Sequence, residues 1–334
     1  MELLIELDLK FSRVSFLPDS IGNLKRLKVL KVAYTKIRMI PYALGGVGTL
    51  EELDASFCPH LGDEIPWEMW SLTRLRILDL DGSPIATMPR RINGFSSLKT
   101  LKIASHRLSP LPKLPLSLKF LAVVTAQFPI LPDLSSLIHL HHLKVRKERC
   151  MTLWIPQEVT SPWKDMSINQ LPFSLSTLKL HSIPQLLDIS DLQSLSILSI
   201  SECLTPCLPN VSHLKRLQEL RLNDFPQLTE IPGLGELETL KFLHISMCDV
   251  IKQLPNLSKL KNLLRLELKH CAKLRAVESL KELNLLEYAE IRNCMSLEML
   301  PDIPTSTKLE TDWMPPEPTE HTIRAAKRLQ LSLD

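Results

Sequence analysis

Cysteine and histidine are the residues of this chain whose chemistry is best suited to binding a metal ion. The chain has 334 residues with seven cysteines, and the run HLHH holds His139, His141 and His142. A zinc site needs thiolate or imidazole ligands that converge on one point. Neighbouring strand residues point to opposite faces, so the histidine run favours a solvated basic edge over a metal site. Cys203 and Cys207 are close in sequence, but Cys203 belongs to a repeated row of cysteines, which favours a structural role.

Signatures of catalysis are missing from the sequence. The chain contains no G-x-x-x-x-G-K-[ST], no H-E-x-x-H and no G-x-S-x-G, which mark phosphate-binding loops, zinc proteases and serine hydrolases. Nine glycines against 25 prolines is an unusual ratio for an enzyme with phosphate-cradling loops. We therefore predict a protein that is not an enzyme and that holds no cofactor or metal.

Composition and charge narrow the class of protein further. Hydrophobic residues make up 44% of the chain, and 40 basic against 37 acidic residues give a formal net charge of +3. This mild balance gives no reason to expect nucleic acid as the main partner. No stretch approaches the roughly 18 apolar residues of a membrane span, and the first residues do not resemble a signal peptide. The odd number of cysteines, without a pairing framework, predicts a reducing compartment, cytoplasmic or nuclear.

One recurring sequence motif, the phrase L-x-x-L-x-L-x-x-C, must position the cysteines and histidines considered above. Clear copies are LLRLELKHC at residues 263–271 and LKFLHISMC at residues 240–248. The first leucine of the phrase falls at residues 4, 27, 50, 75, 98, 118, 140, 175, 195, 217, 240, 263 and 286. A damaged fourteenth copy follows at Leu309, again 23 residues on. A pitch this constant predicts a repeat protein.

Each copy of the phrase predicts a short strand. In Leu266-Glu267-Leu268 the period-two alternation puts the leucines on one side and Glu267 on the other. Such a strand is too short to bury its leucines alone, so successive strands must stack into a parallel sheet over one continuous core. The ninth position is suited to small buried side chains at the corner after the strand, and it holds Cys58, Cys203, Cys248, Cys271 and Cys294. Residues about 23 apart form a row and do not converge, which disfavours zinc.

A second periodic signal, (I/L)-P, follows each corner. Proline fixes an extended backbone and has no N–H to pair, which suits the return of each turn on the outer side. The apolar spacing of residues 18–24 predicts about one turn of helix or 3₁₀ helix there. The predicted fold is therefore an α/β leucine-rich-repeat solenoid. It is a horseshoe with a parallel concave sheet, an irregular or short-helical convex side and about 13–14 repeats of about 23 residues.

The domain prediction is a solenoid over residues 1–314 and a C-terminal tail over 315–334 that serves as a cap or frays. A step of 35 residues between Leu140 and Leu175 indicates an insertion at about 150–172 that contains Trp154 and Trp163. Such a loop is either functional or a tolerated surface insertion. Solenoids need a cap at each end. No segment precedes the first strand, so we expect a fragment or a further domain packed at that end.

The concave face is the candidate binding surface, because its exposed residues are the non-leucine positions of the strands. Early repeats place Asp8, Asp54, Asp79 and Asp81 there, with Lys31 as the exception. Middle repeats place basic residues there: Lys102, Lys144, Arg146, Lys147 and Lys179. We also expect Phe11, Tyr34 and Phe57, which share one strand position in three successive repeats, to stack as an exposed aromatic row. Exposed aromatics beside charge are typical of protein-binding hot spots, although concave faces in general carry mixed polar residues.

The repeats resemble those of plant intracellular immune receptors. The ninth-position cysteine or threonine, the (I/L)-P turn and the 23-residue pitch carry the resemblance. The segments LPKLPLSLKFL and INQLPFSLSTL are similar to repeats of nucleotide-binding, leucine-rich-repeat receptors with an N-terminal TIR domain. The likeness covers roughly Leu4 to Met314. The chain contains neither the nucleotide-binding domain nor the TIR domain, so their chemistry is not carried over. The asparagine and glycine typical of secreted plant repeats are missing.

The resemblance implies a sensor. Its repeat domain would recognise a pathogen effector or a guarded host protein, and it would restrain the signalling domains through contacts with the nucleotide-binding domain. The alternative is a constitutive intracellular scaffold that docks a small GTPase or a ubiquitin-ligase component. In both cases the expected partner is a protein, bound through the aromatic row, the basic residues of the middle repeats and the insertion.

Overall fold

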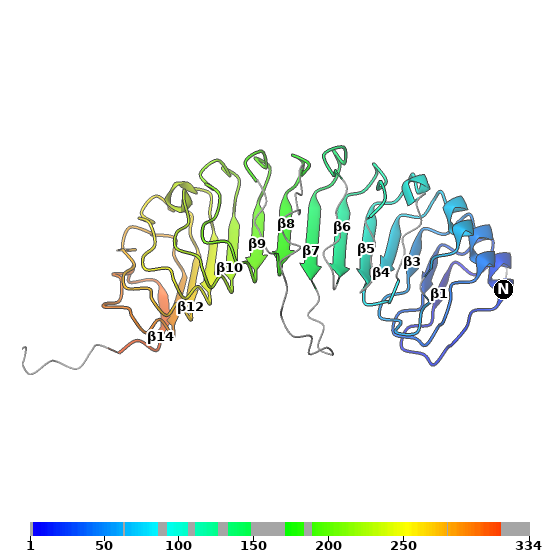
Figure 1. Ribbon diagram of the computed structural model, residues 1–334, viewed down its shortest axis with the longest axis horizontal. Coiled ribbons are helices and arrows are strands. Elements are labelled where there is room, and N and C mark those ends of the chain that lie inside the picture. Colours follow the sequence, from blue (N-terminus) through cyan, green and yellow to red (C-terminus); the bar gives the residue numbers. More distant parts are fainter. Residues whose placement is uncertain are drawn as a thin grey trace, which may run out of the picture.

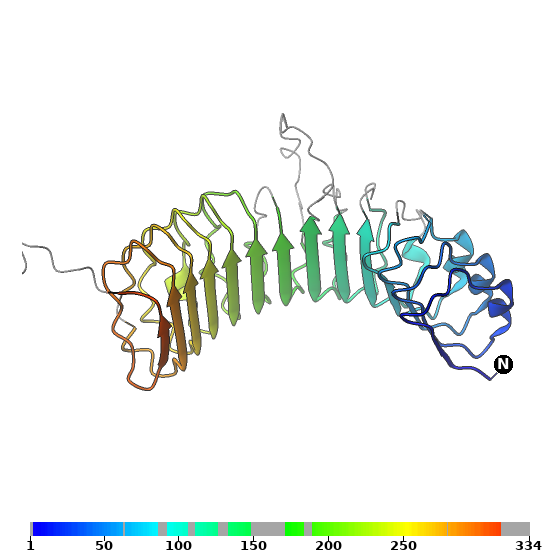
Figure 2. The same ribbon diagram turned by 90° about the horizontal axis from the view of Figure 1, so that it is seen from below.

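The computed structural model describes residues 3–62, 64–85, 92–105, 111–125, 133–147, 171–183, 189–278 and 280–314. Fourteen parallel strands form one sheet in which every strand pairs with its neighbours in sequence. The strands lie side by side along an arc, with the sheet on the inner side and the returning segments on the outer side (Figure 1; Figure 2). The predicted leucine-rich-repeat solenoid is therefore confirmed.

The strands are three to six residues long and coincide with the repeated phrase. They are β1 (Glu6–Asp8), β2 (Val29–Lys31), β3 (Glu52–Asp54), β4 (Ile77–Leu80), β5 (Thr100–Ser105), β6 (Phe120–Thr125), β7 (His142–Lys147), β8 (Thr177–His181), β9 (Ile197–Ser201), β10 (Glu219–Asn223), β11 (Phe242–Ser246), β12 (Arg265–Lys269), β13 (Tyr288–Arg292) and β14 (Lys308–Thr311). The damaged fourteenth copy of the phrase thus forms a strand, and Leu309 pairs with Ala289 of β13.

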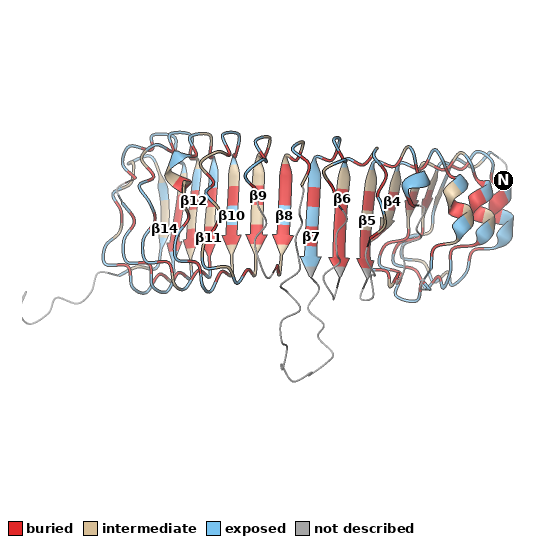
Figure 3. Ribbon diagram, turned by 45° about the horizontal axis from the view of Figure 1, so that its top comes forward, coloured by how far each residue is buried: buried red, intermediate tan, exposed pale blue. Residues whose placement is uncertain are grey.

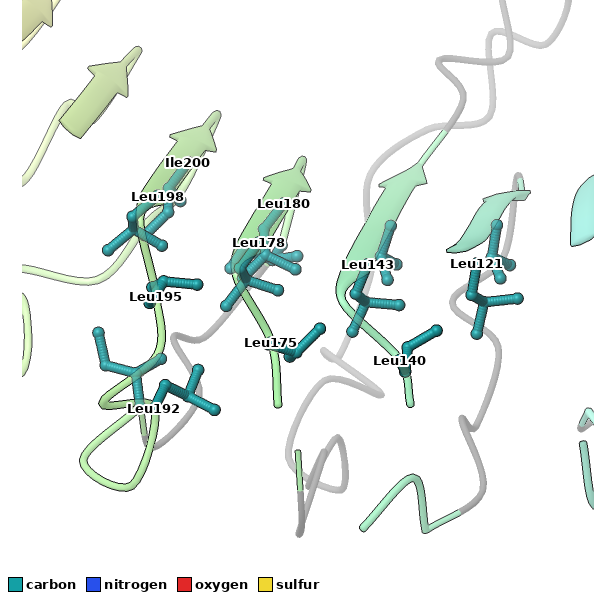
Figure 4. Packing of buried hydrophobic residues seen from close by; sticks show 14 of the residues in the cluster. Leu121, Leu140, Leu143, Leu175, Leu178, Leu180, Leu192, Leu195, Leu198 and Ile200 are labelled. Carbon is teal, nitrogen blue, oxygen red and sulfur yellow. The ribbon is translucent and has the colours of Figure 1, made fainter. Parts of the chain in front are cut away.

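Inward-pointing aliphatic side chains of adjacent repeats form one shared core. The leucines of neighbouring strands pair at the same register, as Leu178 with Leu198 and Leu198 with Leu220. All three are fully buried. Figure 4 shows Leu143, Leu178 and Leu198 projecting from successive strands toward the same side of the sheet. Each leucine therefore gains most of its burial from the adjacent repeats and little from its own strand.

Short 3₁₀ helices follow the prolines on the outer side, as predicted for residues 18–24. They are η1 (Asp19–Asn23), η2 (Tyr42–Gly46), η3 (Trp67–Ser71), η4 (Ile92–Gly94) and η6 (Leu234–Glu236). Pro18 and Pro41 precede η1 and η2 with φ of −73° and −68°, in extended backbone. The part of the chain that the structure describes contains no α-helix. None of its helices is long and apolar enough to cross a membrane.

The ninth-position cysteines occupy the predicted inner corner. Five of them, Cys58, Cys203, Cys248, Cys271 and Cys294, are buried. The Cys58 thiol lies 3.1 Å from the Val32 carbonyl oxygen, to which it donates. A hydrogen bond with Cys248 raises the pKa of Cys271 to about 12, so its thiol stays protonated and inert. Within the described ranges no group of three His, Cys, Asp or Glu residues is arranged to hold a metal ion.

The two ends of the described solenoid differ in how their apolar residues are covered. At the N-terminal end, a pocket of about 440 Å³ is lined by apolar residues that include Leu4, Leu7 and Leu9. At the other end, the Trp313 indole N–H donates to the Leu297 carbonyl at 2.8 Å, and the ring packs against the core. The predicted tail at 315–334 and all but the last two residues of the insertion at about 150–172, with Trp154 and Trp163, lie outside the described residues.

Candidate protein-binding surface

The inner face of the sheet carries one central row of side chains, at the position between the two inward-pointing residues of each strand. Strand register brings these residues directly opposite one another in sequence order. The central row consists of Asp8, Lys31, Asp54, Asp79, Lys102, Ala122, Lys144, Lys179, Ser199, Arg221, His244, Glu267, Glu290 and Glu310. Its charges fall into three zones that differ in how well they are neutralised.

In the N-terminal zone, each lysine of the central row pairs with a carboxylate of an adjacent repeat. The Lys31 ammonium lies 2.7 Å from the Glu6 carboxylate, and the Lys102 ammonium lies 2.6 Å from Asp79. The bond to Asp79 raises the pKa of Lys102. Lys102 was expected to belong to the basic block. Its charge is instead compensated by Asp79. Lys102 therefore belongs to the N-terminal zone, in which acidic residues are in excess.

The central zone contains cations without such partners. Lys144 of β7 and Lys179 of β8 lie directly opposite each other, and both are exposed. Arg146, two residues further along β7, is also exposed. Figure 3 shows the alternation of buried and exposed positions along β7. Among the described residues, no carboxylate lies within ion-pair distance of Lys144, Arg146 or Lys179. We call these three residues the central basic patch.

Small side chains border the central basic patch on β5 and β6. Ala104, Ala122 and Val124 face the inner side of the sheet, yet they are only 5%, 6% and 7% exposed. These apolar side chains form a flat part of the face between Lys102 and the central basic patch.

Lys147 was also predicted to belong to the basic block. It is the last residue of β7, and its backbone pairs with Thr125. Its side chain lies outside the described set.

The positive charge of the centre also affects a neighbouring histidine. Burial lowers the pKa of His142, and the nearby His141 and Lys179 lower it further. Like charges directly opposite each other on adjacent strands destabilise a sheet. The central basic patch therefore costs the folded chain some stability, and a negatively charged binding partner would relieve that repulsion.

In the C-terminal zone, the charges form a continuous network of ion pairs. Glu267 is 2.8 Å from His244, 2.5 Å from Arg265 and 3.2 Å from Lys269. Burial alone would raise the pKa of Glu267, but hydrogen bonds from these three residues outweigh it and lower the pKa to about 2. The network continues through Lys269 to Glu290, at 2.9 Å. Sequence reasoning missed this network, although a repeat alignment already places its alternating charges in adjacent strands.

The aromatic row, defined as Phe11, Tyr34 and Phe57, forms a stack. Ring centroids are 4.7 Å apart between Phe11 and Tyr34 and 4.8 Å apart between Tyr34 and Phe57. Their position in the repeat differs from the prediction. Strands β1, β2 and β3 end three residues earlier, at Asp8, Lys31 and Asp54, so the aromatic residues lie in the turn after the strand. Their backbone φ angles of 58°, 56° and 51° are left-handed, which ends the strand geometry there.

In the fourth repeat, Gly82 occupies the position that the aromatic row fills in the first three repeats. It has φ of 68°, and a Cβ atom added to it would lie 2.5 Å from the Phe57 ring. A side chain at this position would therefore displace Phe57, so the glycine gives the ring its place at the end of the stack. The sequence signal was present, because Gly82 aligns with Phe57 in the repeat.

Comparison with known proteins supports the fold and, in one stretch, a plant relative. No family model matches the chain. A disease resistance protein of Arabidopsis thaliana, RPS4B, is 42% identical over 78 residues, which are 23% of this chain and 6% of that protein. The chain therefore matches only a small part of the relative's length.

Solved structures show the same architecture at low identity. An internalin of Listeria monocytogenes has a TM-score of 0.65 at 16% identity, covering 94% of this chain and 88% of its own. A leucine-rich-repeat protein of Leptospira interrogans has a TM-score of 0.60 at 19% identity, covering 98% and 82%. Together with the fourteen-stranded parallel sheet, these likenesses show that the chain has the leucine-rich-repeat solenoid fold.

Proposed function

We propose that this chain is the protein-recognition domain of an intracellular plant immune receptor, and that it binds a pathogen effector or a guarded host protein on its concave face. The main observation that supports protein recognition at this face is the central basic patch. Lys144, Arg146 and Lys179 are exposed cations of one sheet face without carboxylate partners among the described residues. The lysines of the N-terminal zone and the charges of the C-terminal network are paired within the fold.

The immune role is supported by the stretch that is 42% identical to the resistance protein RPS4B and by the repeat resemblance. In the proposed receptor, located in the cytoplasm or the nucleus, the recognised protein competes with contacts to a nucleotide-binding domain of the full-length protein. Binding then shifts the receptor from its restrained state to its signalling state. The size of this shift is limited to the difference in the affinity of the recognised protein for these two states. The alternative function is a constitutive scaffold for a small GTPase or a ubiquitin-ligase component. A scaffold would bind its partner in uninfected tissue as well.

A two-hybrid screen with the whole chain against pathogen effectors and host proteins tests the proposal. We expect a partner whose binding is lost in Lys144→Glu/Lys179→Glu and kept in the control Lys252→Glu/Lys273→Glu, which makes the same charge change at exposed lysines outside the strands. Two opposed glutamates repel each other as two lysines do, so the first variant should unfold at nearly the wild-type temperature.

Three results would count against parts of the proposal. Equal loss in both variants would show that net charge, and not the central basic patch, drives binding. A partner bound regardless of both changes would place recognition elsewhere. The immune role itself is tested by the full-length transcript. Coding sequence for a phosphate-binding loop and a TIR domain upstream of Met1 would support it, and a partner bound constantly in uninfected tissue would favour the scaffold.

A further inference from the structure

At the centre of the aromatic row, both ring faces are covered and the ring edge is exposed. Tyr34 has a ring stacked on each side, at 4.7 Å and 4.8 Å with interplanar angles of 15° and 10°. It is nevertheless 48% exposed. Because both of its faces are covered, the exposed area consists of the ring edge and the hydroxyl group. The aromatic row therefore presents a narrow ribbon of edges along the solenoid, which ends at Gly82.

The fold does not require aromatic residues at these positions. Other repeats have the same left-handed turn residue, and they fill it with Ser182, Glu202, Asp224, Met247, His270 and Asn293. Left-handed backbone is costly for bulky side chains and is best tolerated by short polar ones. Exposure of three adjacent rings adds a second unfavourable feature. Strained, exposed residues of this kind concentrate at binding sites.

The spacing of the rings matches one kind of bound backbone. Two steps of the row span about 9.5 Å. A polyproline II helix has three residues per turn and a rise of about 3.1 Å per residue, so equivalent residues recur every 9.3 Å or so. An extended strand returns to the same face roughly every 6.6–6.8 Å, which fits neither one nor two steps of the row.

The chemistry of the ribbon agrees with its spacing. The edge of an aromatic ring is the positive end of its quadrupole, and a polyproline II backbone exposes carbonyl oxygens that no internal hydrogen bond uses. The Tyr34 hydroxyl, at the middle of the row, supplies a donor for one such carbonyl. An α-helix running along the row would offer no free carbonyls except at its end.

We propose that the aromatic row binds a proline-rich segment of a partner protein in the polyproline II conformation. The inference rests on the proposed recognition function and names the chemistry of one part of the partner. Equivalent residues one turn apart contact Phe11 and Phe57, and the carbonyl between them accepts from Tyr34. The stiffness of the proline-rich segment reduces the entropy that binding costs.

Fluorescence anisotropy with a labelled ten-residue oligoproline peptide tests this inference on the whole chain. We expect saturable binding with a dissociation constant below about 1 mM and none with a glycine-serine peptide of equal length. The Phe11→Asn/Tyr34→Asn/Phe57→Asn variant keeps residues that favour left-handed backbone and should weaken binding at least about tenfold. Tyr34→Phe removes only the hydroxyl donor and should weaken it about fivefold.

Met247→Asn is the matched control, because Met247 has the same left-handed turn position, is 46% exposed and stacks on no ring among the described residues. It should bind the peptide as the wild type does, and so should Lys144→Glu/Lys179→Glu. Absence of peptide binding up to about 1 mM, or equal binding by the triple-asparagine variant, would overturn the inference. A chain that fails to bind oligoproline but still loses a protein partner through Lys144→Glu/Lys179→Glu would retain the proposed function without this inference.

Discussion

At the scale of single residues, the concave face has charged side chains that are paired within the fold and others that are not. Glu267 has three basic partners within 3.2 Å, and Lys102 has Asp79 at 2.6 Å. These charges are used within the fold. Lys144 and Lys179 face each other across β7 and β8 without a carboxylate in reach among the described residues. The proposed recognition function therefore depends on these two uncompensated lysines.

Glu267 gives a pH-dependent prediction. Its pKa in the folded chain is about 2, below its usual value of 4.5. Because the folded pKa is depressed, its carboxylate stabilises the fold at pH above about 4.5, and this contribution is lost as the pH falls toward 2. Glu267→Gln should therefore be less stable than the wild type at pH 7, with a difference that shrinks as the pH approaches 3.

Urea unfolding at pH 7, 4.5 and 3 measures this effect. Glu298→Gln is the control, because Glu298 is exposed and its carboxylate has no ion-pair partner among the described residues. Its difference from the wild type should be small at every pH. A Glu267→Gln difference that stays constant, or grows as the pH falls, would show that the network does not hold the carboxylate ionised.

At the scale of the element, each strand depends on its neighbours for burial. Leu220 of β10 is fully buried and lies between Leu198 of β9 and Leu243 of β11 at the same register. Leu220→Ala should lower the free energy of unfolding by about 2–5 kcal/mol, from lost burial and the cavity left behind. Leu285→Ala, at a leucine that is 51% exposed, should change it by less than about 0.5 kcal/mol. Equal effects in urea unfolding would contradict a core shared between repeats.

The sequence was sufficient to predict the elements but not their ends. The leucine spacing determined the strands and their register, because each strand buries its leucines only against the adjacent copies. Alignment of the repeats also placed Phe11, Tyr34 and Phe57 at equivalent positions, which stacked as expected. Alignment shows equivalence but not backbone conformation. The left-handed turn that removes these residues from the strands is a steric property that their aromatic identity does not reveal.

The charge pattern of the candidate surface was predictable only in part. The sequence placed Lys144, Arg146 and Lys179 on the concave face, where the structure finds them exposed. It did not reveal that Lys102 is neutralised by Asp79, because this depends on side chains of neighbouring strands reaching each other. Gly82 was missed for a similar reason, since its role lies in the space it leaves for Phe57.

At the scale of the whole molecule, an arc of fourteen strands presents a long inner surface with three zones of charge. The N-terminal zone combines acidic residues with the aromatic row, the centre is basic, and the C-terminal zone is neutralised by its own ion pairs. A partner that binds through both the centre and the aromatic row would span β1 to β8. The zones lie on different strands and share no side-chain contacts with one another in the proposed binding. Their contributions to affinity should therefore be close to additive.

Hydrogen–deuterium exchange of the chain with and without a captured protein partner tests the central claim of recognition at the concave centre most directly. We predict slower exchange at residues 142–146 of β7 and 177–181 of β8 on binding, with no change at residues 252–262 on the outer side. Protection confined to the outer segments, with β7 and β8 unchanged, would contradict recognition through the central basic patch.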